Sequence, residues 1–348
     1  MTKRLDADDP CPVRDGYAMP AEWSEHRRTW MCWPCRTEVW GGPEGLLRAQ
    51  QAFSRVARAI SSFEPVTMAV RPQDAVEARL ACAGKVSLFE VELDDSWARD
   101  MGPSFLVRSD GRRAGTAWRF NAWGNKYHPY TNDAALAEKI LAAAEVRAYA
   151  APLVCEGGAI HVDGEGTLLT TEQCLLNPNR NPHLDRQQVE ERLALFTGAR
   201  RIVWLGDGFS DEETDGHVDN IACFAAPGRV IVGVPAQRSH PDYEPVIEAI
   251  RRLEDQRDAA GRAFEVIEIL QPKRQRADWR GRPLAASYVN FYLANGGLIM
   301  PGFDDPHDER ARDALAECFP GRDILQIDAL DIVQGGGGIH CITQQEPA

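Results

Sequence analysis

The chain has 348 residues, of which 44% are hydrophobic and 26% charged, as expected for a globular protein with a large core. It contains 39 Lys and Arg against 52 Asp and Glu, and the resulting formal charge of −13 disfavours nucleic acid and anionic membrane as partners but tolerates a small cation. Residues 1–10 contain no apolar signal segment, no run is long enough to span a membrane, and nine cysteines do not cluster at metal-ligand spacing, so we expect a reduced, cytoplasmic protein.

The first predicted elements are an apolar strand at 28–34, an amphipathic helix at about 43–62 and a strand at 66–70. Cys32 and Cys35 form a C-x-x-C pair near the first strand, with no second pair nearby. Two ordinary thiols fit this pattern better than a zinc or redox site, which stays the alternative.

A hairpin, a helix and a strand then recur in this order four times. Turns containing Asp-Gly, Pro-Gly or Asn-Gly-Gly predict hairpins at 105–120, 159–171, 220–234 and 288–303. Helical periodicity predicts helices at 136–146, 187–196, 243–260 and 308–319. Short apolar strands are expected after them, at 146–153, 200–205, 264–269 and 323–327.

The chain ends in a predicted strand at 336–345 that has no hairpin partner. Pairing it antiparallel with the strand at 28–34 supplies a fifth hairpin and leaves no sheet edge. We therefore expect an α/β fold, one domain over residues 1–348, in which five ββαβ units close a ring and the first and last strands pair. An ordinary doubly wound α/β sheet is the alternative.

In such a ring, the loop before each hairpin meets the other four at one end of the axis, where sites are usually built. These loops lie at 92–103, 154–160, 207–220, 282–290 and 331–341. Convergence brings together one Cys, one His and three acidic residues, namely Asp100, Glu156, His217, Asp219 and Cys341.

Cys341 follows a run of four glycines at 335–338, where a ligand can approach the backbone closely, and we predict that it is a nucleophile rather than a buried structural Cys. His217 and Asp219 are two apart, so an extended strand would present a base and an anion on one face, as nucleophilic hydrolysis of a cation requires. A metal site that joins His217 to His161 is the alternative.

The segment at 94–103 offers a binding group and an aromatic wall. Asp100 is expected to bind substrate, and Trp97 to cover its apolar or cationic face. Arg99 is either a plain ion-pair partner or the cation that an arginine carboxylate would need. It also stays open whether Trp97 is an ordinary core residue and whether Glu156 has only a structural role.

Six motifs in order make the sequence similar to the agmatine deiminases, within the guanidino-group-modifying (pentein) superfamily. They are MPAEWSEHRRTWMCWP at 19–34, DDSWARDMGP at 94–103, FNAWGNKY at 120–127, EGGAIHVDG at 156–164, DEETDGHVDN at 211–220 and GGGGIHCITQQEP at 335–347. The resemblance implies a five-bladed α/β propeller with pseudo-fivefold symmetry, no cofactor, no metal, and hydrolysis of agmatine to N-carbamoylputrescine and ammonia.

Residue by residue, the resemblance implies that Cys341 is the nucleophile and His217 the general acid and base. It implies that Asp100 and Asp219 grip the guanidinium, and that Glu156 lies against His217 or the substrate.

The resemblance also implies a pocket around the substrate chain, in which Trp97 lines the wall and Glu213 receives the distal amine. Gly338 belongs to the same glycine run, although many relatives have Asn there. Relatives also differ at Asp215 and Asn125, two positions that bear on the pocket more than on the reaction.

Three other functions stay open at this stage. One is a deiminase of another guanidine, such as free arginine, peptidylarginine or a guanidino acid. The second is a non-catalytic propeller, and the third is a metallohydrolase that uses His161 and His217. Self-association into a homo-oligomer is also open.

Overall fold

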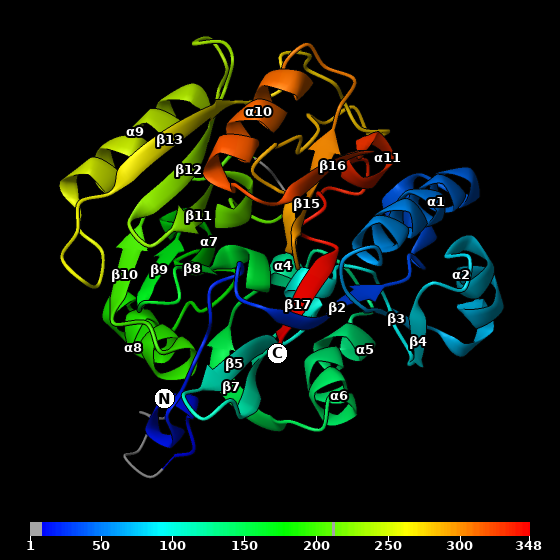
Figure 1. Cartoon of the computed structure of the whole chain (residues 1–348), viewed down its shortest axis with the longest axis horizontal. Helices are drawn as coiled ribbons and strands as arrows, with labels where there is room; N and C mark the ends of the chain where they lie inside the picture. The colour runs from blue at the N-terminus through cyan, green and yellow to red at the C-terminus, as the bar shows by residue number, and fades with distance from the viewer. Residues whose placement is uncertain (1–8, 211–212) are drawn as a thin grey trace.

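The computed structural model describes residues 9–210 and 213–348; residues 1–8, and the first two residues of the motif at 211–220, lie outside the described part. Five separate sheets are present among the described residues. In Figure 1 the longer helices lie around the outside of these sheets, and strands β2 and β17 lie near the middle.

The sheet that joins the two ends of the chain has the order β17-β2-β3-β4. Its strands are β2 (His26–Cys32), β3 (Val66–Val70), β4 (Ser87–Glu90) and β17 (Thr343–Pro347). β17 pairs antiparallel with β2, with Gln344 opposite Trp30, and the indole Nε1 of Trp30 donates to Glu346 Oε2 at 2.8 Å. The predicted pairing of first and last strands is therefore confirmed.

The other four sheets repeat one plan, in which an antiparallel hairpin is followed by a strand parallel to its second strand. The sheet of order β10-β9-β8 follows the same plan with a very short hairpin, since β10 pairs parallel with β9, its second strand. The strands are β1 (Tyr17–Ala18), β5 (Ser104–Arg108), β6 (Arg113–Arg119) and β7 (Arg147–Val154); β8 (His161–Val162), β9 (Thr167–Thr170) and β10 (Arg201–Trp204); β11 (Ala222–Ala226), β12 (Arg229–Val234) and β13 (Glu265–Leu270); and β14 (Tyr292–Ala294), β15 (Gly297–Gly302) and β16 (Asp323–Asp328).

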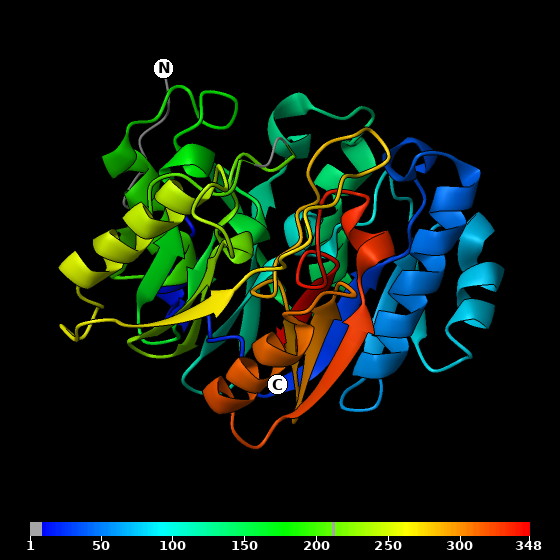
Figure 2. The same cartoon turned by 90° about the horizontal axis from the view of Figure 1, so that it is seen from above.

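One longer helix crosses over within each sheet, between the second hairpin strand and the parallel strand. These helices are α1 (Pro43–Ile60), α6 (Leu136–Ala143), α8 (Arg186–Thr197), α9 (Tyr243–Asp255) and α10 (Asp308–Cys318). Local chemistry sets their ends: in α8, Asp185 and Gln188 form a capping box, and Gly198 ends the helix with a φ of 81°. Figure 2 shows α1 and α9 on opposite sides, with the C-terminal segment between them.

Short helices fill the connections. They are η1 (Pro12–Asp15), η2 (Thr37–Trp40), η3 (Pro72–Asp74), η4 (Gly157–Ala159) and η5 (Val218–Asn220), together with α2 (Ala75–Ala81), α3 (Ala98–Met101), α4 (Ala122–Asn125), α5 (Thr131–Ala134), α7 (Glu172–Leu175) and α11 (Leu330–Val333). No helix in the described residues is long and apolar enough to cross a membrane.

Burial decreases from the inner to the outer strands of a sheet. All five residues of β3 are buried, whereas β16 has no buried residue and exposes its polar side chains. One hydrophobic core extends from Trp30 to Ile342 and includes residues of the N-terminal and C-terminal sheets. The ends of the chain are therefore packed into the same core.

Three predicted elements differ from the structure. The helix predicted at 243–260 ends at Asp255, because Gln256 is extended and a bridge between Arg257 and Ala263 begins a hairpin-like loop. The strand predicted at 336–345 begins only at Thr343; turns precede it, so Cys341 lies before the strand. His217 and Asp219 lie at η5, a 3-10 turn, and not on an extended strand.

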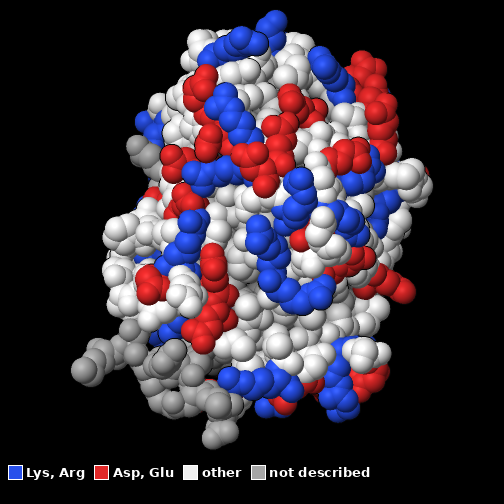
Figure 3. Space-filling model, turned by 90° about the vertical axis from the view of Figure 1, so that its left-hand side faces the viewer, with Lys and Arg blue, Asp and Glu red and all other residues white. Residues whose placement is uncertain are grey.

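Charged side chains on the face in Figure 3 are mixed, with Lys and Arg interspersed among Asp and Glu. No large single-sign field covers that face, so it offers no extended patch for a polyanion.

Candidate active site

Cys341 is 3% exposed and lies just before β17. Its Sγ accepts a hydrogen bond from Asn290 Nδ2 at 3.3 Å and lies 3.7 Å from Asp219 Oδ2. Burial raises the pKa of the Cys341 thiol well above its usual value, and the carboxylates of Asp219 and Asp100 raise it further.

A cavity of about 20 Å³ adjoins this thiol. It is lined by Val39, Trp97, Asp100, Trp123, Tyr127, Glu213, Thr214, Gly335, Gly336, Gly337 and Cys341. This volume holds about one water molecule, so an extended substrate requires the lining side chains to move apart.

The glycine run allows this close packing. A Cβ on Gly337 would lie 2.6 Å from the Trp97 ring and 3.1 Å from Cys341 Cβ. A Cβ on Gly338 would lie 2.4 Å from Asn290 Oδ1, and so would disturb the amide that contacts the thiol. Gly338 therefore supports the site from behind, since it is not among the cavity-lining residues.

The two aspartates predicted to bind a cation both lie at this thiol. Asp100 is held by Trp123 Nε1, which donates to Oδ2 at 2.9 Å, and by the backbone N–H of Gly158, which donates to Oδ1 at 3.0 Å. Burial raises the pKa of Asp100, and Asp219 and Glu156 raise it as well. Asp219 Oδ1 is buried and has no hydrogen-bond partner within the described residues.

His217 lies between two carboxylates, 1% exposed. Its Nδ1 is 3.8 Å from Asp100 Oδ1, and its Nε2 is 3.6 Å from Glu156 Oε2. Burial lowers the pKa of His217, but Asp100 and Glu156, together with Cys174, raise it well above the usual value. The imidazole is therefore protonated at neutral pH and close to both carboxylates.

Trp97 and Glu213 both line the cavity wall. The Trp97 ring stacks on Trp40, with ring centroids 5.6 Å apart. The Glu213 carboxylate accepts a hydrogen bond from Tyr127 and pairs with Arg280 at 3.1 Å and with Arg282. A second cavity of about 440 Å³ shares Glu213 and Gly336 with the first.

Arg99 lies elsewhere. Its side chain is 1% exposed, its Nη1 donates to Glu22 Oε1 at 3.2 Å, and it does not line the cavity. The backbone N–H of Arg99 donates to the carbonyl of Cys341 at 3.1 Å. The structure therefore places its guanidinium beside a buried acid and outside the lining of the Cys341 cavity.

A buried chain of charges behind Asp219 was missed by the sequence reasoning. His340 Nδ1 lies 2.8 Å from Asp219 Oδ2, and His340 Nε2 lies 2.9 Å from Glu22 Oε1. Because both ring nitrogens face carboxylates, both carry protons. Burial lowers the pKa of His340 and raises that of Asp219, but their pairing moves the pKa of His340 above and that of Asp219 below its usual value.

Arg180 was also missed. Its Nε donates to Glu156 Oε1 at 2.7 Å, and its Nη1 donates to Asp215 Oδ2 at 2.7 Å. Arg180 and His217 hold the pKa of Glu156 below its usual value against the effect of burial. In the sequence Arg180 stands in an irregular loop, NPNRNPH, and nothing there distinguishes it from a surface cation.

His161 does not lie with His217 at a possible metal site. Its Nε2 is 3.5 Å from Glu22 Oε2, and it is absent from the group of metal-type ligands found in the described residues. The His161–His217 pair of the metallohydrolase alternative is therefore not brought together.

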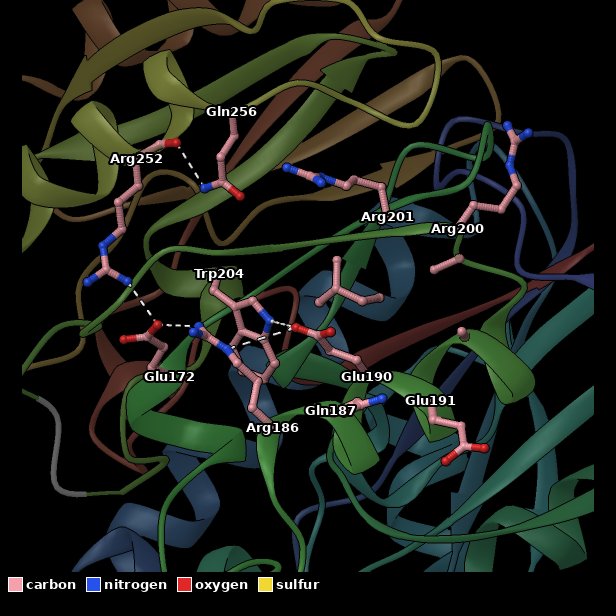
Figure 4. A pocket seen from close by; sticks show the side chains of 13 residues that line it. Glu172, Arg186, Gln187, Glu190, Glu191, Arg200, Arg201, Trp204, Arg252 and Gln256 are labelled. Carbon is pink, nitrogen blue, oxygen red and sulfur yellow. Dashed lines mark hydrogen bonds and ion pairs between the residues drawn. The ribbon is translucent and has the colours of Figure 1, made fainter.

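A wider pocket of about 680 Å³ lies away from Cys341, between α7, α8, β10 and α9 (Figure 4). Two of its arginines pair with one carboxylate: Arg252 Nη1 lies 3.1 Å from Glu172 Oε1, and Arg186 contacts the same side chain. It shares no lining residue with the Cys341 cavity, and we locate the site at the thiol despite the larger volume of this pocket.

A mixed α/β fold of repeated ββαβ units, with a buried thiol beside two carboxylates and an imidazole, is the arrangement expected of the guanidino-modifying class. The chain belongs to the Porphyromonas-type peptidyl-arginine deiminase family, whose model matches residues 18–347.

Several relatives carry the name suggested by the motifs. An agmatine deiminase of Pseudomonas aeruginosa (strain LESB58) is 42% identical, with 97% of each chain covered. The solved agmatine deiminase of Enterococcus faecalis has a TM-score of 0.93 at 37% identity, with 99% of each chain covered. A cysteine-to-serine variant of C. jejuni agmatine deiminase with substrate bound has a TM-score of 0.86 at 28% identity, with 95% of this chain and 96% of that chain covered.

These matches confirm the resemblance to the agmatine deiminases. A saxitoxin-pathway amidinotransferase, 12% identical with a TM-score of 0.53, shares the fold alone.

Proposed function

We propose that the protein hydrolyses the guanidinium group of agmatine, giving N-carbamoylputrescine and ammonia. The observation that carries this proposal is the thiol of Cys341, 3.7 Å from Asp219 and beside a cavity that also contains Asp100 and Glu213. Relatives that cover nearly the whole chain are named agmatine deiminases, which supports this substrate over other guanidines.

Two carboxylates suit a guanidinium, because its planar fork of N–H groups pairs bidentately with carboxylate oxygens. Asp219 Oδ1 is buried and has no hydrogen-bond partner in the described residues, so it is available to such a ligand. We assign Asp100 and Asp219 to hold the guanidinium with its central carbon facing Cys341, and Trp97 to cover its apolar chain.

Substrate binding itself activates the thiol in this proposal. Burial, together with the anionic field of Asp219 and Asp100, raises the pKa of the Cys341 thiol and keeps it protonated in the free protein. A bound cation neutralises that field and lowers the cost of forming the thiolate, so the thiol releases its proton to solvent on binding and regains one when the product leaves.

The reaction then proceeds in two halves. The thiolate of Cys341 attacks the guanidinium carbon, and the His217 imidazolium gives its proton to the departing ammonia, which leaves an S-alkylthiouronium on the sulfur. Neutral His217 next takes a proton from water as the water adds to the same carbon. The carbon–sulfur bond breaks, the thiolate and the imidazolium are restored, and the remaining proton passes to ammonia.

Glu156 acts on this reaction through His217. Its Oε2 faces the imidazole, and Arg180 holds its Oε1. We propose that Glu156 favours the protonated imidazole, which is needed as the acid of the first half.

The ionisation of Asp219 depends on His340, whose Nδ1 lies 2.8 Å from the carboxylate. We propose that His340 keeps this carboxylate ionised and turns Oδ2 away from substrate, and that Glu22 and Arg99 hold His340 in place. Arg99 is thus a positioning residue, in place of the substrate contact predicted from sequence.

We assign Glu213, which lines the cavity, to receive the distal ammonium of agmatine. In the free protein Arg280 and Arg282 pair with it, so the ammonium replaces them. The same two cations also favour a second candidate, a guanidine that carries a carboxylate, such as arginine or a guanidino acid.

At the level of the whole chain, we propose that the five sheets are the blades of a pseudo-fivefold propeller forming one domain. The pairing of β17 with β2, and the core that extends from Trp30 to Ile342, support this. A reducing, cytoplasmic location agrees with nine free cysteines.

An ammonia-release assay tests the function. Agmatine, arginine, a peptidylarginine and guanidinobutyrate are compared, with Cys341→Ser as the inactive control. The highest kcat/KM is expected for agmatine. Release of ammonia by Cys341→Ser would remove the mechanism, and a preference for a carboxylated guanidine would favour the second candidate.

A further inference from the structure

Cys174 is a buried thiol that the proposed reaction does not use. It lies on α7, where the hydroxyl of Thr171 accepts from its backbone N–H at 3.3 Å, and its exposed fraction is 0%. Its Sγ contacts Glu156 Oε2 at 3.9 Å, and the same oxygen lies 3.6 Å from His217 Nε2. A thiol, a carboxylate and an imidazole therefore face one another behind the Cys341 cavity.

The three ligand atoms all lie within 4.8 Å of one another, and theirs is the one such group found within residues 9–210 and 213–348. Zinc binds sulfur at about 2.3 Å and nitrogen or oxygen at about 2.0–2.2 Å, which places tetrahedral ligands about 3.3–3.7 Å apart. Two of the three separations, 3.6 Å from His217 Nε2 to Glu156 Oε2 and 3.9 Å from Cys174 Sγ to the same oxygen, lie within a few tenths of an ångström of this range. The third, between the sulfur and Nε2, is at most 4.8 Å, so these two side chains must move closer together to share an ion.

The imidazole nitrogen that would bind the metal has no hydrogen-bond partner among the described residues. His217 Nε2 is buried and has no hydrogen-bond partner within the described chain, and its contact with Glu156 is longer than a hydrogen bond. A zinc ion would bind this nitrogen at about 2.0–2.1 Å, which is much shorter than its 3.6 Å contact with Glu156.

Charge favours a dication here. Binding requires Cys174 to lose its thiol proton and the His217 imidazolium to lose the proton on Nε2, both to solvent, as the metal–sulfur and metal–nitrogen bonds form. The ligand set then consists of the thiolate, the Glu156 carboxylate and a neutral imidazole, and a divalent ion balances its two negative charges. A sulfur, nitrogen and oxygen ligand set is one that zinc accepts readily, whereas calcium and magnesium prefer oxygen alone.

We propose that Cys174, His217 and Glu156 form an inhibitory site for a thiophilic divalent ion such as Zn²⁺. The ion occupies His217 Nε2 and so removes the acid and base of the reaction. The inhibitory consequence rests on the proposed function, but the metal site itself does not.

Binding is measured with Co²⁺, a coloured probe for zinc sites whose bond to a thiolate gives a charge-transfer absorption. The wild-type protein is expected to show this absorption and to lose it when Zn²⁺ competes. Cys174→Ser is expected to lose it, whereas Cys155→Ser, a matched change at a neighbouring buried thiol, and Cys341→Ser keep it. Absence of the band in the wild type, its persistence in Cys174→Ser, or its loss in Cys341→Ser would overturn the proposal.

His217→Asn is a second variant that leaves every cysteine in place, so it does not depend on Cys174→Ser folding. Its affinity for Co²⁺ should fall by about tenfold or more; an unchanged affinity also overturns the proposal. In the assay, the Zn²⁺ concentration for half inhibition should be at least about tenfold higher in Cys174→Ser than in Cys155→Ser. If Cys341→Ser releases ammonia while the Co²⁺ results hold, the proposed reaction fails and the metal site stands.

Discussion

Replacing His340 by Ala tests how Asp219 is kept ionised. In the structure His340 Nδ1 lies 2.8 Å from Asp219 Oδ2, and both side chains are buried. Without the imidazolium, Asp219 is a buried anion beside Asp100 and the Cys341 thiol. Breaking a buried pair in this way costs about 3–5 kcal/mol, part of which is recovered when the carboxyl protonates.

The expected effect on catalysis follows from the lost charge. A charge-assisted hydrogen bond to substrate contributes about 1.5–3 kcal/mol, so kcat/KM for agmatine should fall by about 10- to 100-fold at neutral pH. The pKa of Asp219 is held below its usual value in the native protein, and the ionised form is the one that binds. Its rise in the variant moves the acid limb of the kcat/KM profile to higher pH.

The assay is ammonia release by the wild type, His340→Ala and His340→Asn from acid to neutral pH. The Asn side chain can place its Nδ2 near the original Nδ1, so it should restore part of the activity and part of the acid limb. If His340→Ala keeps the wild-type pH profile, whether or not its rate falls, His340 does not act through the charge of Asp219.

Three further results are expected. The thiol of Cys341, followed by ultraviolet absorbance against a Cys341→Ser blank, should titrate at lower pH when a non-reactive guanidinium ligand is bound, and an unchanged titration would contradict activation by substrate. Glu213→Gln should raise the KM for agmatine by about tenfold or more but leave an alkylguanidine without the amine unaffected; equal losses for both would place the distal amine elsewhere. Arg180→Met should lower the free energy of unfolding at neutral pH by about 3–5 kcal/mol, since it strands buried Glu156, against less than about 1 kcal/mol for the exposed Arg186→Met. The folded pKa of Glu156 is lowered, so the Arg180→Met deficit should shrink as the pH falls below the usual value of 4.5, and a deficit independent of pH would show a packing effect instead.

The order of elements was predictable because each unit carries its own local signals. Turn residues and apolar periodicity identified the hairpins and the five longer helices, α1, α6, α8, α9 and α10. The unpaired strands at both ends indicated the pairing of β17 with β2. Boundaries were less predictable. The loop after α9 continues the helical pattern of residues, and the backbone leaves the helix where an Asp258 turn and the bridge from Arg257 to Ala263 are more favourable.

The site was predictable where its residues stand in distinctive motifs, as Asp100, Asp219 and Cys341 do. Glu22 stands within the first motif and His340 directly before Cys341, yet neither was assigned, because their role depends on a partner distant in sequence. From sequence alone, a buried ion pair cannot be distinguished from two surface charges. The expected substrate contact of Arg99 is misplaced for the same reason, since Glu22, distant in sequence, holds its guanidinium.

The proposed reaction depends on a covalent bond between Cys341 and the guanidinium carbon. Acid quenching of the protein during turnover of agmatine, followed by peptide mass spectrometry, detects this bond directly. We expect an adduct with the mass of agmatine less one ammonia, on the peptide that contains Cys341, which appears during turnover and disappears when substrate is exhausted. An adduct on another cysteine, or product formation at full rate with no adduct at any quench time, would contradict it.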